Sequence, residues 1–331
     1  MKILFYDAAT YDVESFEKEL NHFPDIEIIY HEVDISPKTV SLAQGCDAIC
    51  AFVNSDLSAP VLEKLAAINI RLVLLRCAGF NNIDLEKANE LGITVLRVPG
   101  YSPYAVAEHT MGLLLCLNRK IHKAYNRTRD FNFTLNGLTG FDLHGKTVGV
   151  IGTGRIGQIF MNICKGFGME VLAYDPYPAN GPSIHYVDLH TLFQQSDILS
   201  LHCPLTEQSK HLINKDTIAD MKDGVVLLNT SRGMLIESEA LLSALQSGKI
   251  AAAGLDVYEE ETAFFFEDFS ENIHRDQVLS LLLSMPNVLL TSHQAFLTNE
   301  ALKNIAEVTL QNLADFFDGK PLQNEVKTGQ L

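Results

Sequence analysis

The stretch VGVIGTGRIGQ, residues 148–158, predicts a strand, a tight glycine turn and the first turn of a helix. Gly152 allows the chain to turn sharply, Gly154 allows the backbone to approach a phosphate group, and Gly157 allows the helix to pack against the strand. The helix N-terminus would add unpaired N–H groups and the positive end of the helix dipole. Three glycines also occur in turns that bind nothing, so the surrounding sequence has to distinguish a nucleotide site from a structural turn.

An acidic residue at the end of the following strand favours the nucleotide site. The strand-like run VLAYD ends at Asp175, 18 residues after Gly157. A carboxylate at this position can accept hydrogen bonds from both hydroxyls of an adenosine ribose, and it repels a 2′-phosphate. The sequence therefore predicts NAD, in preference to NADP, as the cofactor.

Strand-like and helix-like segments alternate along nearly the whole chain. Apolar runs such as KILFYD (2–7), AICAF (48–52) and RLVLLRC (71–77) precede the glycine turn, and helical segments such as APVLEKLAAI (59–68) lie between them. This alternation predicts parallel βαβ units, and a length of 331 residues predicts about two domains. We therefore expect an α/β protein with two Rossmann-like or flavodoxin-like domains, parallel sheets, and a cleft between the domains that could hold a ligand.

The alternation is interrupted near residue 101, where the sequence predicts a long helix. Residues 102–128 have helical periodicity, with Ser102 as the N-cap and Pro103 at the first helical position. A polar, glycine-containing stretch follows at 132–145, and apolar residues at helical spacing predict a last helix over 299–319.

Composition and charge narrow the range of partners and locations. Acidic residues outnumber basic residues by 41 to 25, and the resulting formal charge of −16 argues against binding to nucleic acid or to anionic membranes. The apolar runs are too short for a signal peptide or a membrane span. The six cysteines form no CxxC motif, so we expect reduced thiols, no metal site and a cytoplasmic location.

Polar side chains follow four strand-like runs after the glycine turn. The residues at these positions are His202, Arg232, Asp256 and His293, and Glu261 lies five residues beyond Asp256. Each of them alone has an ordinary explanation, such as a turn residue, a surface ion pair or a loop cap. Ligands of open α/β sheets bind beyond the carboxyl ends of the strands, so we expect these side chains to converge on one crevice.

The residue types at these strand ends match the chemistry of 2-keto acid reduction. An arginine such as Arg232 presents a planar, bidentate fork to a carboxylate. A histidine such as His293 titrates near neutral pH and can donate a proton to a developing alkoxide, and a glutamate such as Glu261 beside it would raise the pKa of the imidazole. Together these three residues predict a site that reduces a 2-keto acid with NADH.

The sequence resembles the D-isomer-specific 2-hydroxyacid dehydrogenase family over nearly its whole length, and most closely the fermentative NAD-dependent D-lactate dehydrogenases within it. The motifs that carry the resemblance are LRCAGFNNID (75–84), GLTGFDLHGKTVGVIGTGRIG (137–157), YDPYP (174–178), LHCPLT (201–206), NTSRG (229–233), LDVYE (255–259) and SHQAF (292–296).

The resemblance implies roles for individual residues. Arg232 would bind the substrate carboxylate, and His293, paired with Glu261, would exchange the proton. The residues implied at the cofactor are Gly152, Gly154, Arg155, Ile156, Gly157, Asp175, His202, Cys203, Pro204, Thr230 and Asp256, with Asp256 near the nicotinamide amide. Those implied at the substrate are Phe52, Ala78, Gly79, Tyr101 and Phe296, with Ala78 and Gly79 contributing backbone N–H groups.

The resemblance also implies a discontinuous domain organisation. Residues 1–100 with 299–331 would form the substrate domain and residues 101–298 the NAD-binding domain, with hinges near residues 100 and 298 that close the cleft around the reaction. Relatives form a twofold contact on the helix that matches the one starting at Ser102, which implies a homodimer or homotetramer.

Three features leave alternatives open. Ser209 stands where relatives often have asparagine, which puts one cofactor contact in doubt. Phe52 is either a core residue or the wall of a small pocket suited to the methyl group of pyruvate, with D-lactate as the product. The acidic, phenylalanine-rich segment 259–277 is either a surface loop or an oligomer contact.

Two alternative functions of the whole protein also remain open. One is a related reductase acting on glyoxylate, hydroxypyruvate or 2-ketoisocaproate, and the other is an NAD-sensing corepressor-like protein without enzymatic activity.

Overall fold

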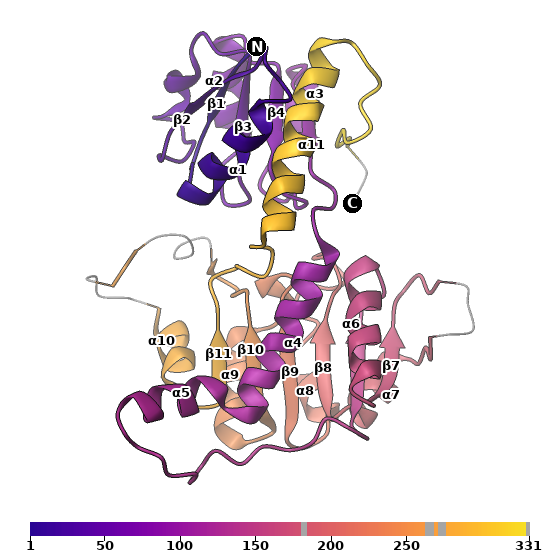
Figure 1. Cartoon of the computed structure of the whole chain (residues 1–331). Helices are drawn as coiled ribbons and strands as arrows, with labels where there is room; N and C mark the ends of the chain where they lie inside the picture. Colours follow the sequence, from indigo (N-terminus) through magenta and orange to yellow (C-terminus); the bar gives the residue numbers. More distant parts are fainter. Residues whose placement is uncertain (180–183, 262–267, 271–275, 329–331) are drawn as a thin grey trace. The chain divides into compact units, whose positions relative to one another are not determined.

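The computed structural model describes residues 1–179, 184–261, 268–270 and 276–328, and the chain divides into two compact units (Figure 1). Unit 1 consists of Met1–Ser102 and Leu297–Leu331, and unit 2 of Pro103–Phe296. These bounds lie two residues from the expected domain borders. Each unit contains a parallel sheet with helices between its strands, which confirms the predicted α/β fold class.

Unit 1 has a five-stranded sheet in the order β2-β1-β3-β4-β5, and each pair of neighbouring strands runs parallel. Its strands are β1 Lys2–Phe5, β2 Glu27–Tyr30, β3 Ala48–Ala51, β4 Leu72–Leu75 and β5 Thr94–Arg97. Its helices are α1 Thr10–Leu20, the 3-10 turn η1 Val40–Ala43, α2 Ala59–Ala67, α3 Leu85–Glu90 and α11 Asn299–Phe317. The central strands β3 and β4 are buried throughout, as their continuous apolar sequences require.

The last helix, α11, belongs to unit 1 although it follows unit 2 in the sequence. It packs against α1, and these two helices lie side by side in Figure 1. The side-chain amide of Asn312 on α11 donates a hydrogen bond to the backbone oxygen of Arg97 at the end of β5, over 3.0 Å. The chain thus returns to its first sheet to complete that core.

Unit 2 has a six-stranded sheet in the order β11-β10-β9-β8-β6-β7, again with parallel neighbours. Its strands are β6 Thr147–Ile151, β7 Glu170–Tyr174, β8 Ile198–Leu201, β9 Val225–Asn229, β10 Ile250–Leu255 and β11 Val288–Leu290. Its helices are α4 Pro103–Arg119, α5 Ile121–Arg129, α6 Arg155–Gly166, α7 Leu189–Gln195, α8 Lys215–Asp220, η2 Gly233–Leu235, α9 Ser238–Ser247 and α10 Gln277–Ser284.

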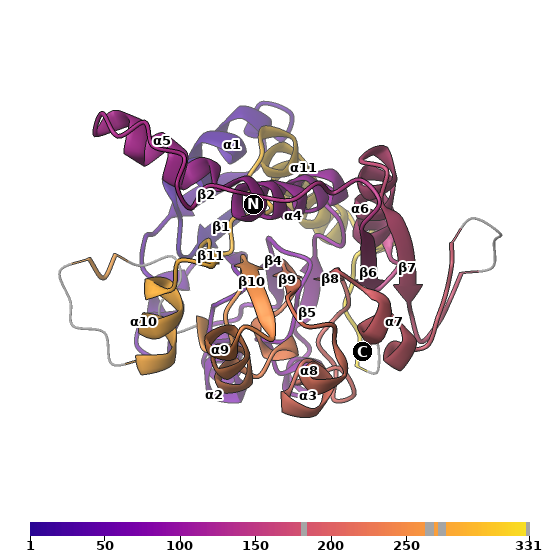
Figure 2. The same ribbon diagram turned by 90° about the horizontal axis from the view of Figure 1, so that it is seen from below.

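Helices cover both faces of this second sheet. Val148 and Val150 of β6 pack into a core with α4 and α6, whereas Ile151 contributes to a core with α7 and α9 on the other face. Figure 2 shows the sheet of unit 2 between α4 on one side and α8 and α9 on the other. The strand order reverses between β6 and β8, so the carboxyl ends of these strands form the switch point at which such sheets bind ligands.

One expectation for this unit was wrong. The single helix predicted over 102–128 is two helices, because Lys120 between α4 and α5 has a left-handed conformation with φ of 50°. Pro103 is the first residue of α4, as predicted. Among the described residues, none of the helices is long and apolar enough to cross a membrane.

Candidate active site

The glycine turn between β6 and α6 has the steric properties of a nucleotide-binding turn. Gly152 has φ of 95°, and a Cβ added to it would lie 2.5 Å from the backbone carbonyl of His202. A Cβ on Gly157 would lie 2.1 Å from the oxygen of Gly152. Gly154, the N-cap of α6, has no atom within 4 Å of an added Cβ, so open space remains where a phosphate group would approach the helix N-terminus.

Asp175 is held directly beside this turn. Its Oδ2 accepts hydrogen bonds from the backbone N–H of Thr153, over 2.7 Å, and from the Thr153 hydroxyl, over 2.9 Å. Its Oδ1 accepts one from the backbone N–H of Tyr177, over 2.9 Å. A carboxylate fixed in this position accepts ribose hydroxyls and repels a 2′-phosphate, so the turn and Asp175 together fit NAD.

His293 and Glu261 form a pair at the carboxyl end of the same sheet. The Nδ1 of His293, three residues after β11, lies 3.0 Å from Oε1 of Glu261, and their side chains are 17% and 13% exposed. An ionised carboxylate only accepts hydrogen bonds, so Nδ1 carries the hydrogen in this pair. In the neutral imidazole of this arrangement, Nε2 is the ring nitrogen without a hydrogen.

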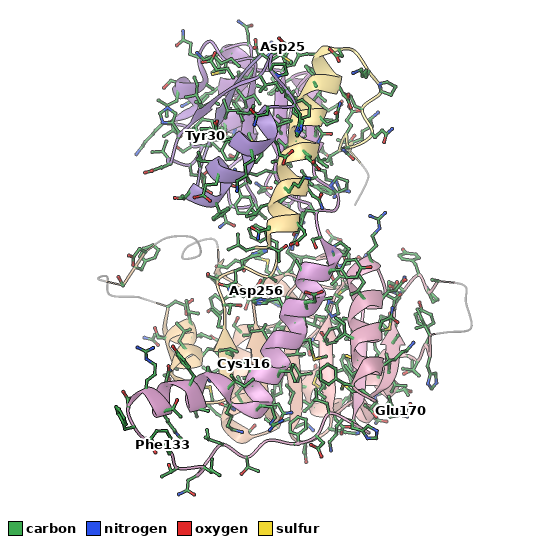
Figure 3. All side chains as sticks on the ribbon, in the orientation of Figure 1. Asp25, Tyr30, Cys116, Phe133, Glu170 and Asp256 are labelled. Carbon is green, nitrogen blue, oxygen red and sulfur yellow. The ribbon has the colours of Figure 1, made fainter. Side chains whose placement is uncertain are left out.

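Asp256 organises the loop that carries His293. Its carboxylate is fully buried and accepts hydrogen bonds from the Thr291 hydroxyl and from the backbone N–H groups of Gln294 and Ala295. Its backbone oxygen accepts one from the N–H of His293, over 2.7 Å. His293 has φ of 53°, a left-handed conformation that costs a non-glycine residue about 1 kcal/mol or more, and these bonds hold it there. Asp256 is labelled in Figure 3 just beyond β10.

Arg232 provides a cation beyond the end of β9. Its Nη1 donates a hydrogen bond to the backbone oxygen of Ser231, over 2.7 Å, and within the described residues no carboxylate lies within ion-pair distance of its guanidinium. The side chain of Asn229 fixes this turn, since it accepts from the N–H of Ser231 and donates to the oxygen of Arg232. A half-buried guanidinium without a counter-ion is suited to bind an anionic ligand.

A family model described as "D-isomer specific 2-hydroxyacid dehydrogenase, NAD binding domain" matches residues 111–295. The chain is 50% identical over 329 residues to the D-lactate dehydrogenase of Escherichia coli, covering 98% of this chain and 100% of the relative. The chain belongs to the D-isomer-specific 2-hydroxyacid dehydrogenase family. NAD is therefore its cofactor, and the chain is an NAD-dependent enzyme.

Solved structures of relatives have the same fold as this family member. The apo-structure of D-lactate dehydrogenase from Escherichia coli aligns with a TM-score of 0.90 at 48% identity, covering 98% of this chain and 100% of that one. A structure of D-2-hydroxyisocaproate dehydrogenase aligns with a TM-score of 0.86 at 37% identity, covering 98% and 99%.

In this dehydrogenase, His202 is a half-buried neutral histidine at the switch point. Burial lowers the pKa of its imidazole to about 3. Its Nε2 lies 2.9 Å from the Ser200 hydroxyl, and its ring lies 4.9 Å from that of Phe160. Its Nδ1 is buried and has no hydrogen-bond partner among the described residues, so it is a polar atom still available to a ligand.

The lowered pKa of His202 predicts how stability depends on pH. Its pKa falls from the ordinary value of 6.5 to about 3 on folding, so between these values the unfolded chain binds a proton that the folded chain does not. The free energy of unfolding should therefore decrease by about 1.4 kcal/mol per pH unit as the pH falls through this range. In urea titrations between about pH 4 and 6, His202→Gln should make the free energy of unfolding less dependent on pH, by the amount that corresponds to about one bound proton. The control His185→Gln, at an exposed histidine, should not, and an unchanged slope in His202→Gln would contradict the assignment.

The side chain of Ser209 forms its hydrogen bonds within the loop that follows β8. The Ser209 hydroxyl accepts a hydrogen bond from the N–H of Thr206, over 2.8 Å, and donates one to the oxygen of Pro204, over 2.7 Å. The serine thus stabilises the turn that follows Cys203, and burial keeps the Cys203 thiol neutral by raising its pKa to about 11. Thr230, also expected at the cofactor, is buried against the hydroxyl of Thr110, 2.8 Å away.

The predicted substrate residues of unit 1 follow the ends of its strands. Ala78 and Gly79 lie in the turn after β4, and in the described part of the chain no acceptor is paired with either backbone N–H. Phe52 directly follows β3 and is 7% exposed, with the Arg76 guanidinium 4.6 Å from its ring centroid. The oxygen of Tyr101 accepts a hydrogen bond from the amide of Asn304 on α11, over 2.6 Å.

Several residues that support the site could not be identified from the sequence. Thr153 holds Asp175 at the glycine turn, and Asn229 shapes the turn that presents Arg232. Thr291 bridges Asp256 and the imidazole of His109, whose Nε2 lies 3.1 Å from the threonine hydroxyl. Asn229 lies within the motif NTSRG and Thr291 directly precedes SHQAF, but nothing in the sequence indicates which group each side chain binds.

Proposed function

We propose that this family member is a D-lactate dehydrogenase, which transfers hydride reversibly between NADH and pyruvate. The observation that carries the proposal is the His293–Glu261 pair, because a histidine held by a carboxylate is the proton donor that reduction of a carbonyl group requires. The name of the 50% identical Escherichia coli relative, D-lactate dehydrogenase, supports pyruvate and D-lactate as the reactants.

Each of the three proposed catalytic residues has one task. Arg232 binds the carboxylate of the 2-keto acid through its guanidinium, which has no carboxylate partner among the described residues. His293 donates a proton from Nε2 to the carbonyl oxygen as charge develops there, and takes it back in the reverse direction. Glu261 keeps the imidazole oriented through its contact with Nδ1. Bound NADH supplies the hydride.

The proposed cofactor residues divide between the glycine turn and the loops beyond it. The N-terminus of α6, with Gly154, Arg155 and Ile156, would bind the pyrophosphate, and Asp175 the adenosine ribose. The residues proposed along the rest of NAD are His202, Cys203, Pro204, Thr230 and Asp256. The carboxylate of Asp256 already accepts three hydrogen bonds from the loop that carries His293, so its contribution to NAD stays a prediction.

The substrate domain is proposed to consist of residues 1–100 with 299–331, and the NAD-binding domain of residues 101–298. The backbone N–H groups of Ala78 and Gly79 are proposed as further donors to the substrate carboxylate, which their lack of acceptors among the described residues supports. Tyr101 and Phe296 are proposed at the substrate on the family resemblance alone.

A panel of 2-keto acids tests this function. NADH oxidation should be fastest with pyruvate and slower with glyoxylate, hydroxypyruvate and 2-ketoisocaproate. A preference for 2-ketoisocaproate would instead indicate a D-2-hydroxyisocaproate dehydrogenase, which is the name of one relative of known structure. Failure to oxidise NADH with any of the four would overturn the proposed dehydrogenase reaction.

Phe52 is proposed to restrict the substrate side chain to a methyl group. We expect Phe52→Ala to raise kcat/KM for 2-ketoisocaproate relative to pyruvate by about tenfold or more, because removal of a ring leaves room for several methylene groups worth about 1 kcal/mol each. Steady-state kinetics with both substrates measure the ratio, and Phe52→Tyr, which keeps a ring, is the control. An unchanged ratio in Phe52→Ala would mean that Phe52 is only a core residue.

A homodimer or homotetramer is proposed as the assembly. The segment after α5 exposes Phe131 by 86%, Phe133 by 69% and Leu135 by 80%, and α5 itself exposes Tyr125 by 58% (Figure 3 labels Phe133). Apolar surface of this extent supports a contact with a second copy of the chain, and the mass from analytical ultracentrifugation distinguishes dimer from tetramer. Most of segment 259–277, the other predicted oligomer contact, lies outside the described residues.

Cytoplasm is the proposed location, because none of the six cysteines forms a disulfide.

A further inference from the structure

Another histidine–carboxylate pair of unit 2 has its glutamate two residues before Glu261 in the sequence. The Nε2 of His211 lies 2.6 Å from Oε1 of Glu259, and the side chains are 35% and 18% exposed. The other oxygen of Glu259 accepts a hydrogen bond from the backbone N–H of Ser238, the first residue of α9, over 2.9 Å. Burial raises the pKa of the Glu259 carboxyl, but the hydrogen bonds from Ser238 and His211 outweigh it and lower the pKa, so the carboxylate stays charged.

His211 is fixed to the turn that carries Arg232. Its backbone N–H donates to the oxygen of Met234, over 2.8 Å, and two residues later Ile213 donates to the oxygen of Leu235, over 3.0 Å. Met234 and Leu235 belong to η2, which has Arg232 as its N-cap. Any displacement of His211 is therefore transmitted to the backbone that presents the guanidinium.

Glu259 is fixed to the turn that carries Glu261. The N–H of Tyr258 donates to Oε2 of Glu261 over 3.0 Å, and the N–H of Glu261 donates to the oxygen of Tyr258 over 3.2 Å. The same backbone lies against η2 so closely that a Cβ on Gly233 would be 1.9 Å from the oxygen of Tyr258 and 2.6 Å from the nitrogen of Glu259. The turns bearing Arg232 and Glu261 are thus packed backbone to backbone.

The pair joins loops that follow three neighbouring strands. His211 lies in the loop after β8, η2 follows β9, and Glu259 follows β10. Backbone contact alone allows the two turns to slide along each other, whereas a charge-assisted hydrogen bond specifies one register. We propose that His211 and Glu259 are positioning residues that hold the Arg232 turn in register with the Glu261–His293 pair.

This inference rests on the proposed function, because it assigns the pair an effect on how the substrate carboxylate is bound. Neither residue is proposed to touch substrate or NAD. Loss of the pair should therefore weaken binding at Arg232 and leave the cofactor site unchanged. A purely structural pair, by contrast, would alter stability and leave the kinetics of the folded enzyme as they were.

Glu259→Gln tests the proposal, because it removes the charge and keeps the size of the side chain. We expect KM for pyruvate to rise by about tenfold with a smaller change in kcat, since lost positioning of a binding group reduces uniform binding. The Kd for NADH, measured by fluorescence titration, should not change. Glu260→Gln is the matched control: it makes the same change one residue away, at an exposed glutamate for which no hydrogen bond or ion pair is found within the described residues.

Double variants show whether the pair acts through Arg232. His211→Gln should reproduce the effect of Glu259→Gln, and the two together should do no more than either one. In the Arg232→Met background, Glu259→Gln should leave KM unchanged, because the group it positions is gone. If Glu259→Gln does not fold, His211→Gln provides the same comparison. Additive effects with Arg232→Met, or a KM no higher than that of Glu260→Gln, would overturn the proposal.

Binding of oxamate separates this inference from the proposed function. Oxamate carries a carboxylate and an amide carbonyl and cannot be reduced as pyruvate is, so its affinity for the NADH complex can be measured without turnover. We expect Glu259→Gln to weaken oxamate about tenfold, in line with KM. Failure of the wild-type chain to reduce any 2-keto acid would overturn the function, whereas equal oxamate affinities in Glu259→Gln and the wild type would overturn the positioning role.

Discussion

Replacement of His293 by glutamine should lower kcat for pyruvate reduction by about two to four orders of magnitude and leave the affinity for NADH unchanged. Glutamine retains a hydrogen-bond donor near the carbonyl oxygen but cannot deliver a proton from a positively charged group. The position of the imidazole depends on Glu261 and on the loop held by Asp256, neither of which is altered by the substitution.

Two readouts are needed for His293→Gln. Steady-state kinetics with pyruvate measure the loss of turnover, and fluorescence titration with NADH shows that the cofactor site persists. His185→Gln, at an exposed histidine of the same unit, controls for loss of an imidazole as such. Turnover within threefold of the wild type would mean that another group supplies the proton, and the assignment of His293 would fail.

Replacement of Arg232 by methionine should reduce kcat/KM for pyruvate by about a hundredfold to a thousandfold, mostly through KM. The guanidinium is half-buried and has no carboxylate within ion-pair distance among the described residues, so the substrate carboxylate is its proposed partner. Removal of a charged partner of this kind leaves the substrate carboxylate desolvated and unpaired.

The specificity of the Arg232 effect can be measured with hydroxyacetone, a carbonyl compound without a carboxylate. The preference for pyruvate over hydroxyacetone should fall in Arg232→Met by about the same factor as kcat/KM for pyruvate. Arg232→Lys should recover part of the loss, because lysine keeps the charge and loses the bidentate fork. An unchanged preference would show that Arg232 does not recognise the carboxylate.

The sequence was sufficient to predict the parts of this enzyme that follow from local patterns. The glycine turn, with Asp175 after the next strand, indicated the NAD site, and the turn has the predicted sterics at Gly152 and Gly157. The position of polar residues after apolar runs predicted that His202, Arg232, Asp256 and His293 would converge, because the carboxyl ends of parallel strands share one edge of the sheet. The pairing of Glu261 with His293 was implied by the family resemblance, and the two side chains lie 3.0 Å apart although 32 residues separate them.

Two features of the fold could not be predicted, because no residue type in the sequence signals them. The break at Lys120 has neither glycine nor proline to signal it, so the helical periodicity of 102–128 concealed two helices. The return of α11 to unit 1 followed only from the family resemblance, since amphipathic periodicity does not specify which sheet a helix covers.

The partners of charged side chains were the least predictable part of the site. Glu259 lies in the family motif LDVYE, but its partner His211 is 48 residues away in the sequence. The donors to Asp256 from Gln294 and Ala295 are backbone N–H groups, which nearly every residue type has, so the sequence does not indicate these hydrogen bonds. Such contacts depend on how loops from neighbouring strands meet, and only the folded structure supplies that information.

The stereochemistry of lactate oxidation tests the central claim most directly. The purified chain should reduce NAD⁺ with D-lactate and show no activity with L-lactate at the same concentration, with the formation of NADH followed by its absorbance. Oxidation of L-lactate alone, or of neither enantiomer, would contradict the proposal that this family member is a D-lactate dehydrogenase.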